Sequence, residues 1–443
     1  MSSSTTNNPN PLPILIIGSG LGGLLLAQAL LSASIPFAIY ERDAAPSVRP
    51  QGYRIRISGD GIAALEATLP PAIFQRFEQT CARVKLLGAV GPGGAAIDAR
   101  TGREVEGEEG AKYKPTPAHV KRMQQAATRR RPYTPDRAAA RRVLMEGGVG
   151  ERVRWGKAFE GYDVVEEEEE GGKKKKKKKV VVARFADGST AKGCLLVGAD
   201  GARSRVRRQF LGDVLRPVDT RGRIVYGKTA MTAEVEERMP EGLLDAMRLV
   251  EERGRADGAP VTCLYEPIRF PQRGEVEGCP EEDYVYWVLV SRKEVFGVED
   301  GVLARMSSEE AKELALEVTK EWNPQLRALF ELADPTQTAA MRVLSMRPEM
   351  AAWEPLREPV TLLGDAAHVM SPSGGVGAVT AFRDAANLAK VLVENGGQVS
   401  AEIIGKYEAM MKEYAKEAIE ESRQGGVRFF NHPPFEECKS VDA

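Results

Sequence analysis

Apolar and polar positions near the N-terminus come in blocks. Residues Ile14 to Ile17 form a fully apolar run, which is typical of a strand buried on both faces of a parallel sheet. The stretch Leu24 to Leu31 has the pattern of a helix, and Phe37 to Tyr40 is a second short apolar run. This order predicts a strand–helix–strand unit at the start of an α/β domain.

The middle of the chain has a different pattern. Stretches rich in Val, Tyr and Trp predict an antiparallel sheet, with strands at Arg223 to Thr232, Thr262 to Phe270 and Tyr284 to Ser291. Helical patterns follow at Ser308 to Trp322, Ala381 to Val393 and the long amphipathic stretch Ala401 to Gln424. Between the first and second of these helices, Arg357 to Leu363 has the pattern of a strand that returns to the first domain.

These patterns predict a discontinuous first domain with a second domain inserted into it. A length of 443 residues is consistent with two or three domains. We expect a disordered tail at 1–10, a nucleotide-binding domain at 11–75, 110–212 and 341–400, an inserted antiparallel-sheet domain at 76–109 and 213–340, and a C-terminal helix and tail at 401–443.

A charged segment interrupts the first domain. The runs Glu166–Glu170, Gly171–Gly172 and Lys173–Lys179 lie between Val153 to Val165 and Val180 to Phe185. The flanking stretches predict two paired strands with the glycines at the tip of a hairpin, so that opposite charges face each other. The alternative is a docking loop for anionic partners, which is disfavoured because block charge runs usually lie solvated at loop tips.

Composition and charge limit the classes of function. The net charge is −1, which argues against nucleic acid as the main partner. The five cysteines are scattered and include no Cys-x-x-Cys pair, so neither a metal site nor a disulfide framework is indicated. No apolar run approaches the ~18 residues of a membrane span, and the polar segment Met1 to Asn10 does not resemble a signal peptide. We therefore expect a cytoplasmic protein without a transmembrane segment, of undetermined oligomeric state.

Three glycines follow the first strand directly, in Gly18-Ser-Gly20-Leu-Gly-Gly23. In this arrangement Gly18 permits a tight turn, Gly20 lets the backbone approach a pyrophosphate, and Gly23 lets the helix pack close to the strand. The phosphates would lie on free N–H groups at the helix N-terminus. Glu41, directly after the second strand, suits a ribose diol. The alternative, a glycine-rich turn without a ligand, is disfavoured by the order of strand, glycines, helix, strand and acid.

Two further stretches consist of a strand followed by an aspartate beside a glycine. They are Cys194–Val197 with Asp200-Gly201, Ser204 and Arg207, and Val360–Leu363 with Gly364-Asp365. Three such stretches in this order are far more specific than any one of them. Two alternatives stay open: Asp365 as the cap of the next helix, and Arg207 as the partner of a local carboxylate.

On these residues the chain resembles the class A FAD-dependent monooxygenases, the para-hydroxybenzoate hydroxylase-like flavoprotein family, over about residues 12–393. The resemblance rests on the three motifs, Pro372 and Gly375-Val-Gly377 after Asp365, Arg137 within Pro135-Asp-Arg-Ala-Ala-Ala-Arg-Arg-Val-Leu, and Trp353. It implies an α/β fold with a Rossmann-like FAD-binding domain, an inserted antiparallel-sheet substrate domain and a C-terminal helix.

The cofactor that the resemblance implies is FAD. Glu41 would hold the adenosine ribose, Arg137 would assist the glycine loop at the pyrophosphate, and Asp365 would bond a ribitol hydroxyl or the pyrophosphate side. Backbone N–H groups at the start of a helix would face the flavin N1 and O2 edge, where negative charge develops on reduction. The expected cofactor contacts are Gly18, Gly20, Gly23, Glu41, Arg42, Arg54, Arg137, Asp200, Arg207, Asp365, Gly375, Gly377 and Ala378.

The chain departs from the family pattern at two places. Val379 stands where many members carry Asn, so the pocket near the flavin is expected to lack one polar contact. In Gln51-Gly-Tyr-Arg54-Ile-Arg56, Arg54 stands where many members have a small residue, and the alternation of apolar and polar residues predicts a strand. Arg54 or Arg56 would reach the cofactor or a substrate anion; the alternative is a solvated strand face.

The resemblance also implies the reaction. NAD(P)H, docking transiently, would reduce the flavin, O2 would add to give a C4a-hydroperoxyflavin, and one oxygen atom would hydroxylate or epoxidise a small organic substrate, aromatic or a secondary-metabolite intermediate. Tyr226 is the candidate catalytic residue, to orient substrate or relay a proton; a packed core tyrosine is the alternative. His368 is expected to be structural. A flavin oxidase or dehydrogenase and a non-catalytic FAD-bound protein are the competing functions.

Overall fold

The structure is a computed structural model that describes residues 11–46, 53–84, 96–105, 132–168, 177–239, 242–252, 254–255 and 258–441. The expected tail at 1–10, the hairpin tip Gly171-Gly172 and the dipeptide Gln51-Gly52 lie outside the described residues.

A five-stranded parallel sheet forms the centre of the nucleotide-binding region. Its order is β17 (Val360–Leu362), β11 (Leu195–Gly198), β1 (Ile14–Ile17), β2 (Phe37–Tyr40) and β7 (Val153–Arg154). Every neighbouring pair is parallel. All four residues of β1 and of β11 are buried, which explains why continuous apolar runs identified these strands in the sequence.

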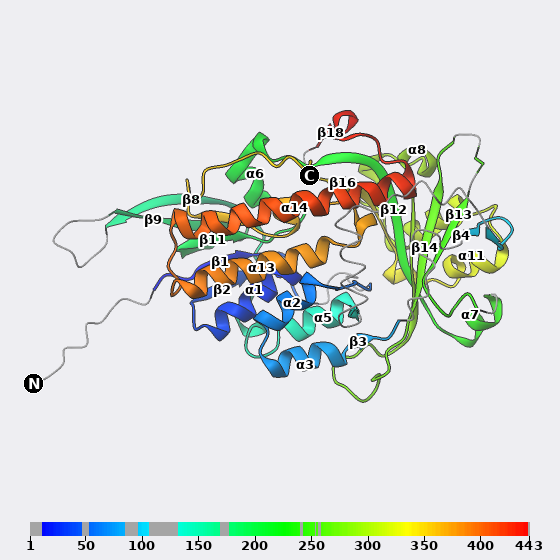
Figure 1. Ribbon diagram of the computed structural model, residues 1–443, viewed down its shortest axis with the longest axis horizontal. Coiled ribbons are helices and arrows are strands. Elements are labelled where there is room, and N and C mark those ends of the chain that lie inside the picture. The colour runs from blue at the N-terminus through cyan, green and yellow to red at the C-terminus, as the bar shows by residue number, and fades with distance from the viewer. Residues whose placement is uncertain are drawn as a thin grey trace, which may run out of the picture.

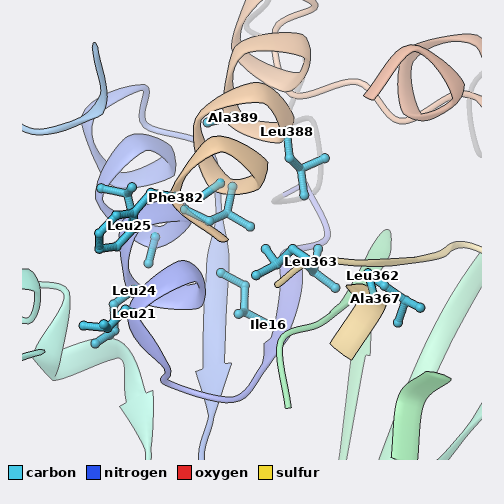
Figure 2. Close-up of a cluster of buried hydrophobic side chains, with 14 of the residues drawn as sticks. Ile16, Leu21, Leu24, Leu25, Leu362, Leu363, Ala367, Phe382, Leu388 and Ala389 are labelled. Atoms are coloured by element: carbon cyan, nitrogen blue, oxygen red, sulfur yellow. The ribbon is translucent and has the colours of Figure 1, made fainter. Parts of the chain in front are cut away.

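Helices cover this sheet. They are α1 (Leu21–Ser32), α2 (Asp60–Thr68), α3 (Pro71–Gln79), α5 (Arg137–Leu144), α6 (Arg205–Leu211), α12 (Asp365–His368) and α13 (Gly377–Glu394). Figure 2 shows Ile16 of β1, Leu25 of α1 and Phe382 of α13 in one apolar cluster, and all three are fully buried. The N-terminal unit and the segment near residue 380 therefore share one hydrophobic core.

The predicted strand pairing is confirmed by a three-stranded antiparallel sheet of β8 (Phe159–Glu168), β9 (Lys177–Phe185) and β10 (Thr190–Gly193). The expected start of the first strand at Val153 was wrong, because Val153–Arg154 form β7 of the parallel sheet. Glu166 lies opposite Lys179 and Glu168 lies opposite Lys177 in the register of the two long strands. The hairpin projects from the body of the molecule (Figure 1), so these charges face solvent and each other.

An eight-stranded, mostly antiparallel sheet forms the other half of the molecule (Figure 1). Its main path is β16 (Ala339–Ser345), β12 (Val218–Ala230), β15 (Tyr284–Arg292), β14 (Val261–Ile268), β13 (Arg248–Glu252), β4 (Ala96–Asp98) and β5 (Glu104–Val105), and β18 (Lys439–Ser440) pairs with β12. The short ladder β3 (Cys81–Ala82) with β6 (Thr134–Pro135) stands apart.

The two faces of this sheet differ. Trp287 of β15 and Tyr265 of β14 lie on the face that packs on helices, where Phe330 joins them in a second hydrophobic core. The helices of this region are α7 (Ala233–Arg238), α8 (Lys293–Phe296), α9 (Asp300–Leu303), α10 (Ser308–Val318) and α11 (Pro324–Glu331). Strand alternation directs Tyr226, Tyr286 and Glu266 to the opposite face.

Helix α14 (Ala401–Phe430) runs along both halves of the molecule (Figure 1). The expected end at Gln424 was wrong, because the helix continues through Gly425 and Gly426. A Cβ at Gly425 would lie 2.6 Å from the carbonyl oxygen of Ser373, so the missing side chain is what admits the neighbouring loop. At its C-terminal end, Thr262 of β14 donates a hydrogen bond of 2.9 Å to the Phe429 carbonyl.

The expected fold class is confirmed: a parallel α/β unit, an antiparallel sheet inserted between its segments, and a C-terminal helix. The domain boundaries given from the sequence stay a prediction. The strand expected around Arg54 was wrong, because this segment makes only isolated bridges, Arg54 with Asp136 and Ile57 with Tyr133.

Candidate functional site

The glycine loop lies at the carboxyl end of β1, as such loops do in open α/β sheets. Gly18 has φ +106°, and a Cβ there would lie 2.4 Å from the carbonyl oxygen of Ala199. A Cβ at Gly23 would lie 2.5 Å from the Gly18 carbonyl oxygen. At Gly20 the nearest atom would be 4.0 Å away. Two of the glycines are therefore needed by the fold, whereas Gly20 borders open space.

Helix α1 begins at this loop without a side-chain cap and without an acidic residue in its first turn. The first helical bond is from Leu24 N–H to the Gly20 carbonyl, at 2.9 Å. The preceding N–H groups of the helix are left for another acceptor, and the helix dipole favours an anion at this point. This is the arrangement that a pyrophosphate requires.

Glu41 follows β2 and is buried beside the loop. Its Oε2 accepts hydrogen bonds from the backbone N–H (2.9 Å) and the hydroxyl (2.8 Å) of Ser19, and its Oε1 accepts one from Asp43 N–H (3.1 Å). Burial by itself would raise the pKa of Glu41, but these hydrogen bonds outweigh it and lower the pKa. Glu41 is therefore a fixed carboxylate, while the neighbouring Arg42 is exposed.

Arg141 is a site residue that the sequence reasoning missed. Its Nε donates to the Ser19 carbonyl (3.0 Å), and its guanidinium also reaches the Ser19 hydroxyl (2.5 Å) and lies 3.9 Å from Glu41. Arg137, for which a pyrophosphate contact was expected, lies one helical turn earlier on α5. Its positive charge lies close enough to Tyr226 to act on the pKa of that hydroxyl. The signal was in the sequence, because positions four apart share a helix face.

The polar side chains of the mid-chain motif form hydrogen bonds with other groups of the protein. Asp200 accepts hydrogen bonds from the Ser204 hydroxyl (2.5 Å) and from Arg205 N–H (2.8 Å) at the start of α6. Arg207 donates to the carbonyls of Ala366 (2.9 Å) and Ala202 (2.8 Å). Arg207 thus joins the mid-chain motif to the segment around Asp365, whereas the hydrogen bonds of Asp200 stay within the motif. The cofactor contacts expected of both residues stay predictions.

Asp365 follows β17 and is the first residue of α12. It is exposed although its neighbours on both sides are buried, and its carboxylate makes no hydrogen bond within the described residues. The cap position belongs to Gly364, which has φ +60°. Asp365 is therefore not the helix cap, which was the alternative role. Its carboxylate is exposed at the sheet edge that also carries the glycine loop.

A buried network holds this turn in place. Asp384 of α13 accepts hydrogen bonds from Gly364 N–H (2.6 Å) and the Tyr414 hydroxyl (2.6 Å), and it lies 2.6 Å from His368 Nε2. Burial acts to lower the pKa of His368, but the charge and hydrogen bond of Asp384 outweigh it and raise the pKa. His368 is fully buried and structural in this arrangement.

Helix α13 begins at Gly377, two residues after Gly375, which has φ +63° and open space around its missing Cβ. The helix has no side-chain cap, and its first internal bond is from Thr380 N–H to the Val376 carbonyl, at 2.9 Å. The N–H groups of Gly377 and Ala378 are therefore free to bind an electronegative edge. Val379, which departs from the family pattern, is buried and packs against Gly61 of α2.

The two uncapped helix starts belong to neighbouring helices. A Cβ at Gly22 of α1 would lie 2.9 Å from the Leu363 side chain and 3.3 Å from the carbonyl of Ala381 in α13. Two anion-favouring helix ends and the exposed Asp365 carboxylate thus share one edge of the parallel sheet. This donor and acceptor set fits FAD, which carries a pyrophosphate, hydroxyls and a flavin edge with electron-rich atoms.

The antiparallel sheet carries Tyr226 on the face opposite the helices. The rings of Tyr53 and Tyr226 lie 4.5 Å apart edge to face, and those of Tyr53 and Tyr286 lie 5.9 Å apart, stacked. Burial and a hydrogen bond with Tyr53 raise the pKa of Tyr226 far above its ordinary value. The hydroxyl is therefore neutral, and Tyr226 belongs to an aromatic cluster rather than standing alone.

Arg54, for which a cofactor contact was expected, has another partner. Its Nε lies 2.6 Å from Oε2 of Glu266 on β14, a buried carboxylate that also pairs with Arg56. The side chain of Arg54 lies over the Tyr286 ring, 5.1 Å from the centroid. The alternative of a solvated strand face was wrong, because both arginines are largely buried against Glu266. A contact of Arg54 or Arg56 with the cofactor or with a substrate anion stays a prediction.

Sequence comparison identifies relatives of this chain. A family model described as an FAD binding domain matches residues 268–422. The chain is 37% identical to the dual O-methyltransferase/FAD-dependent monooxygenase elcB of Phaeosphaeria nodorum, over 96% of this chain and 47% of the relative. It is 38% identical to the similarly named CTB3 of Cercospora beticola, over 98% of this chain and 48% of the relative. The chain thus spans about half the length of these two relatives.

Solved structures share the fold. A putative FAD-containing monooxygenase from Photorhabdus luminescens superposes with a TM-score of 0.69 at 25% identity, covering 94% of this chain and 98% of that one. CtdE in complex with FAD and a substrate has a TM-score of 0.69 at 18% identity, covering 96% and 92%.

Two features are absent from the described part of the chain. No helix there is long and apolar enough to cross a membrane. Among the same residues, no group of three or more His, Cys, Asp or Glu side chains could hold a metal ion.

The glycine loop, the two free helix starts and the exposed aspartate at one sheet edge are features that an FAD-binding fold requires. The chain matches an FAD binding domain model over residues 268–422 and is similar over nearly its whole length to proteins named as FAD-dependent monooxygenases.

Proposed function

We propose that this chain is an FAD-dependent monooxygenase unit that uses NAD(P)H and O2 to hydroxylate or epoxidise a small organic substrate, aromatic or a secondary-metabolite intermediate. The observation that carries the proposal is that α5 connects the two regions: Arg141 contacts the glycine loop at Ser19, and Asp136, which caps the same helix, pairs with Lys228 on the sheet face that carries Tyr226. The relatives named for both a methyltransferase and a monooxygenase support it, and this chain matches about half of their length.

Several of the expected cofactor contacts have a task in this proposal. The N–H groups that follow Gly20 would hold the pyrophosphate, with Arg141 fixing the loop beneath it through Ser19. Glu41 would accept hydrogen bonds from the adenosine ribose, and Asp365 would bind a ribitol hydroxyl.

The second free helix start would act on the flavin itself. Gly377 and Ala378 would present N–H groups to the N1 and O2 edge of the flavin, where fixed donors stabilise negative charge. The N–H of Gly375, which was expected to join them, donates to the Pro372 carbonyl at 2.9 Å, so Gly375 would only border the flavin. When bound, the flavin supplies the electron transfer and oxygen activation that side chains cannot perform.

The antiparallel sheet would form the surface against which the substrate binds. Tyr226 has a neutral hydroxyl and lies in a cluster from which water is largely excluded, so it would orient the substrate as a hydrogen-bond partner. NAD(P)H would dock transiently, since the chain has one glycine-loop motif of the dinucleotide type. The domain boundaries drawn from the sequence belong to this proposal.

The test starts with an absorption spectrum of the purified chain, followed by NADPH and NADH oxidation in air with a panel of phenolic and polyketide compounds. Oxidation stimulated by one compound, with an atom from 18O2 in the product, is the expected result. Bound flavin that neither nucleotide reduces would overturn the proposal. Reduction with hydrogen peroxide as the sole oxygen product would favour the oxidase.

A pair of variants connects the spectrum to the site. Asp365→Ala should lower FAD affinity by about tenfold or more, an effect of about 1.4 kcal/mol. Asp213→Ala is the matched control, because Asp213 is exposed in the turn after α6, where it pairs with Arg216. Equal FAD affinity in the two variants would remove Asp365 from the cofactor site.

A further inference from the structure

A largely buried ion pair joins the antiparallel sheet to helix α5. The ammonium group of Lys228 on β12 lies 2.7 Å from Oδ2 of Asp136, the residue that caps α5. The Tyr284 hydroxyl donates to the same oxygen at 3.0 Å, and the ammonium group lies over the Tyr284 ring, 4.3 Å from its centroid. The Asp136 side chain is 5% exposed, so these contacts are shielded from solvent.

Asp136 uses its second carboxylate oxygen to hold the start of the helix. Oδ1 accepts hydrogen bonds from Ala138 N–H at 2.9 Å and from Ala139 N–H at 3.2 Å. Burial alone would raise the pKa of Asp136, but the positive charge and the hydrogen bond of Lys228 are the main causes that lower it below its ordinary value. One ionised carboxylate therefore binds the sheet through one oxygen and the helix through the other.

The rest of α5 is fixed to the glycine loop and to the helix that follows this loop. Arg141, one turn into α5, donates to the Ser19 carbonyl at 3.0 Å. The side-chain amide of Gln28 on α1 donates to the Leu144 carbonyl at the end of α5, at 2.9 Å. Helix α5 has 8 residues and is therefore roughly 12 Å long. A helix this short passes a displacement of its first turn on to Ser19.

Lys228 lies at the substrate side of the antiparallel sheet. It shares a face of β12 with Tyr226, because positions two apart on a strand point the same way. The start of α5 is also bonded to the segment that packs on this face. Arg137 N–H donates to the Tyr53 carbonyl at 3.0 Å, and the Tyr53 ring lies 4.5 Å from that of Tyr226. The first turn of α5 is thus held by the residues around the aromatic cluster.

We propose that Lys228 is a positioning residue for FAD, which acts through Asp136 and α5 on the glycine loop. The inserted sheet thereby helps to set the affinity of the nucleotide-binding region for its cofactor. A buried carboxylate that loses its counter-charge is strongly disfavoured. Without the ammonium group, Asp136 takes up a proton or turns toward solvent, and the capped start of α5 shifts. The inference rests on the proposed function, because it takes the glycine loop as the site of the pyrophosphate.

The experiment uses the full chain and two measurements, FAD affinity from the quenching of flavin fluorescence and urea unfolding of the flavin-free chain. Lys228→Gln should weaken FAD binding by about tenfold, or about 1.4 kcal/mol. Lys228→Arg should restore most of the affinity, because it returns a cation to the same place.

Thr229→Val is the matched control for lost stability. Thr229 is the next residue on β12 and is fully buried on the opposite face of the sheet. Its hydroxyl donates to the Leu329 carbonyl at 2.6 Å and accepts from the Trp287 indole N–H at 3.1 Å. The variant should unfold at a lower urea concentration and bind FAD like the wild type.

Tyr284→Phe is a milder change at the same ion pair. It removes one hydrogen bond to Asp136 and keeps both the ring and the ammonium group. FAD binding should weaken by about threefold, because the loss of one such bond is a smaller effect than the loss of the charge. This variant keeps the inference testable if Lys228→Gln does not fold.

A double-mutant cycle separates positioning from a general loss of stability. Arg141→Gln should also weaken FAD binding by about tenfold. Adding Lys228→Gln to it should cause little further loss, because both changes break the same series of contacts. Independent losses would multiply to about a hundredfold, and that result would overturn the inference. So would Lys228→Gln with wild-type affinity, or Thr229→Val with a loss of FAD affinity as large as that of Lys228→Gln.

Failure of the proposed function gives different results. If Arg141→Gln and Gly20→Ala both bind FAD like the wild type, the proposed pyrophosphate site and this inference fail together. If these two variants lose affinity while Lys228→Gln and Tyr284→Phe do not, only the inference fails. If all affinities change as expected but neither NADPH nor NADH reduces the bound flavin, the monooxygenase proposal fails and the role of Lys228 stands.

Discussion

Two glycines in the same loop should respond oppositely to the same substitution. Gly20→Ala adds a methyl group whose nearest neighbour is 4.0 Å away, whereas Gly23→Ala places it 2.5 Å from the Gly18 carbonyl oxygen. The backbone at Gly20 has φ −69°, which any residue adopts. The first change should therefore affect the ligand, and the second should affect the fold.

The magnitude at Gly23 follows from two opposing effects. Overpacking a close contact costs about 1–3 kcal/mol, and the upper end applies because the obstructing atom is backbone and the side chains of Ile16 and Ala199 lie 3.3 Å away. Alanine in a helix is favoured over glycine by about 1 kcal/mol. We expect Gly23→Ala to lower the free energy of unfolding by about 2 kcal/mol, and Gly20→Ala to change it by less than about 0.5 kcal/mol.

The assay has two parts. Urea unfolding of the flavin-free chain gives the stability of each variant, and quenching of flavin fluorescence gives FAD affinity. Gly20→Ala should weaken FAD binding by about tenfold, or about 1.4 kcal/mol, because its methyl group occupies the approach of the pyrophosphate. The reasoning is refuted if Gly20→Ala binds FAD like the wild type, or if both variants lose equal stability without flavin.

Three further changes test the buried contacts. Asp384→Asn should lower the free energy of unfolding by about 3 kcal/mol, because it breaks a buried pair. Because Asp384 raises the pKa of His368 above its ordinary 6.5, wild-type stability should fall as pH rises above about 6.5, and the variant should lose this slope. The absence of such a slope in the wild type would contradict the pairing. Trp353→Phe removes the indole N–H that donates to buried Glu408 at 2.9 Å, so it should lower the free energy of unfolding by about 1–2 kcal/mol. An unchanged midpoint of thermal unfolding would contradict this prediction. Tyr226→Phe should lower product formation by about tenfold at constant flavin content. Because burial raises the pKa of Tyr226, the wild-type activity should show no change from tyrosine ionisation up to about pH 9. A change in that range that disappears in the variant would contradict this.

The sequence predicted the parallel sheet well because its strands are short apolar runs. Strands such as Ile14–Ile17 are buried on both faces, so every residue in them is apolar and the strand can be recognised from the sequence. The arginine beside the glycine loop was harder. Arg137 and Arg141 both follow Pro135 on one helix face, and only the packing of α5 against Ser19 selects Arg141.

Other differences between expectation and structure have similar causes. The alternation around Arg54 predicts a strand, but among the described residues this segment pairs only through isolated bridges. A local sequence pattern does not determine which strand, if any, pairs with it. The helix end expected at Gln424 lies just before two glycines, and glycine weakens helices. The structure continues the helix there because the loop at Ser373 occupies the place of a side chain at Gly425. In both cases a contact distant in sequence decided the outcome.

Helix α14 has a consequence for exchanging parts between relatives. It contacts the loop before α13 at Gly425, and its C-terminal turn is bonded to β14 and packed on Gly222 of β12. A chimera that transplants the inserted sheet alone would join a foreign sheet to the native end of this helix. The transplanted piece should therefore include residues from about Gly425 onward together with the sheet, even though some two hundred residues separate them along the chain from the start of β12.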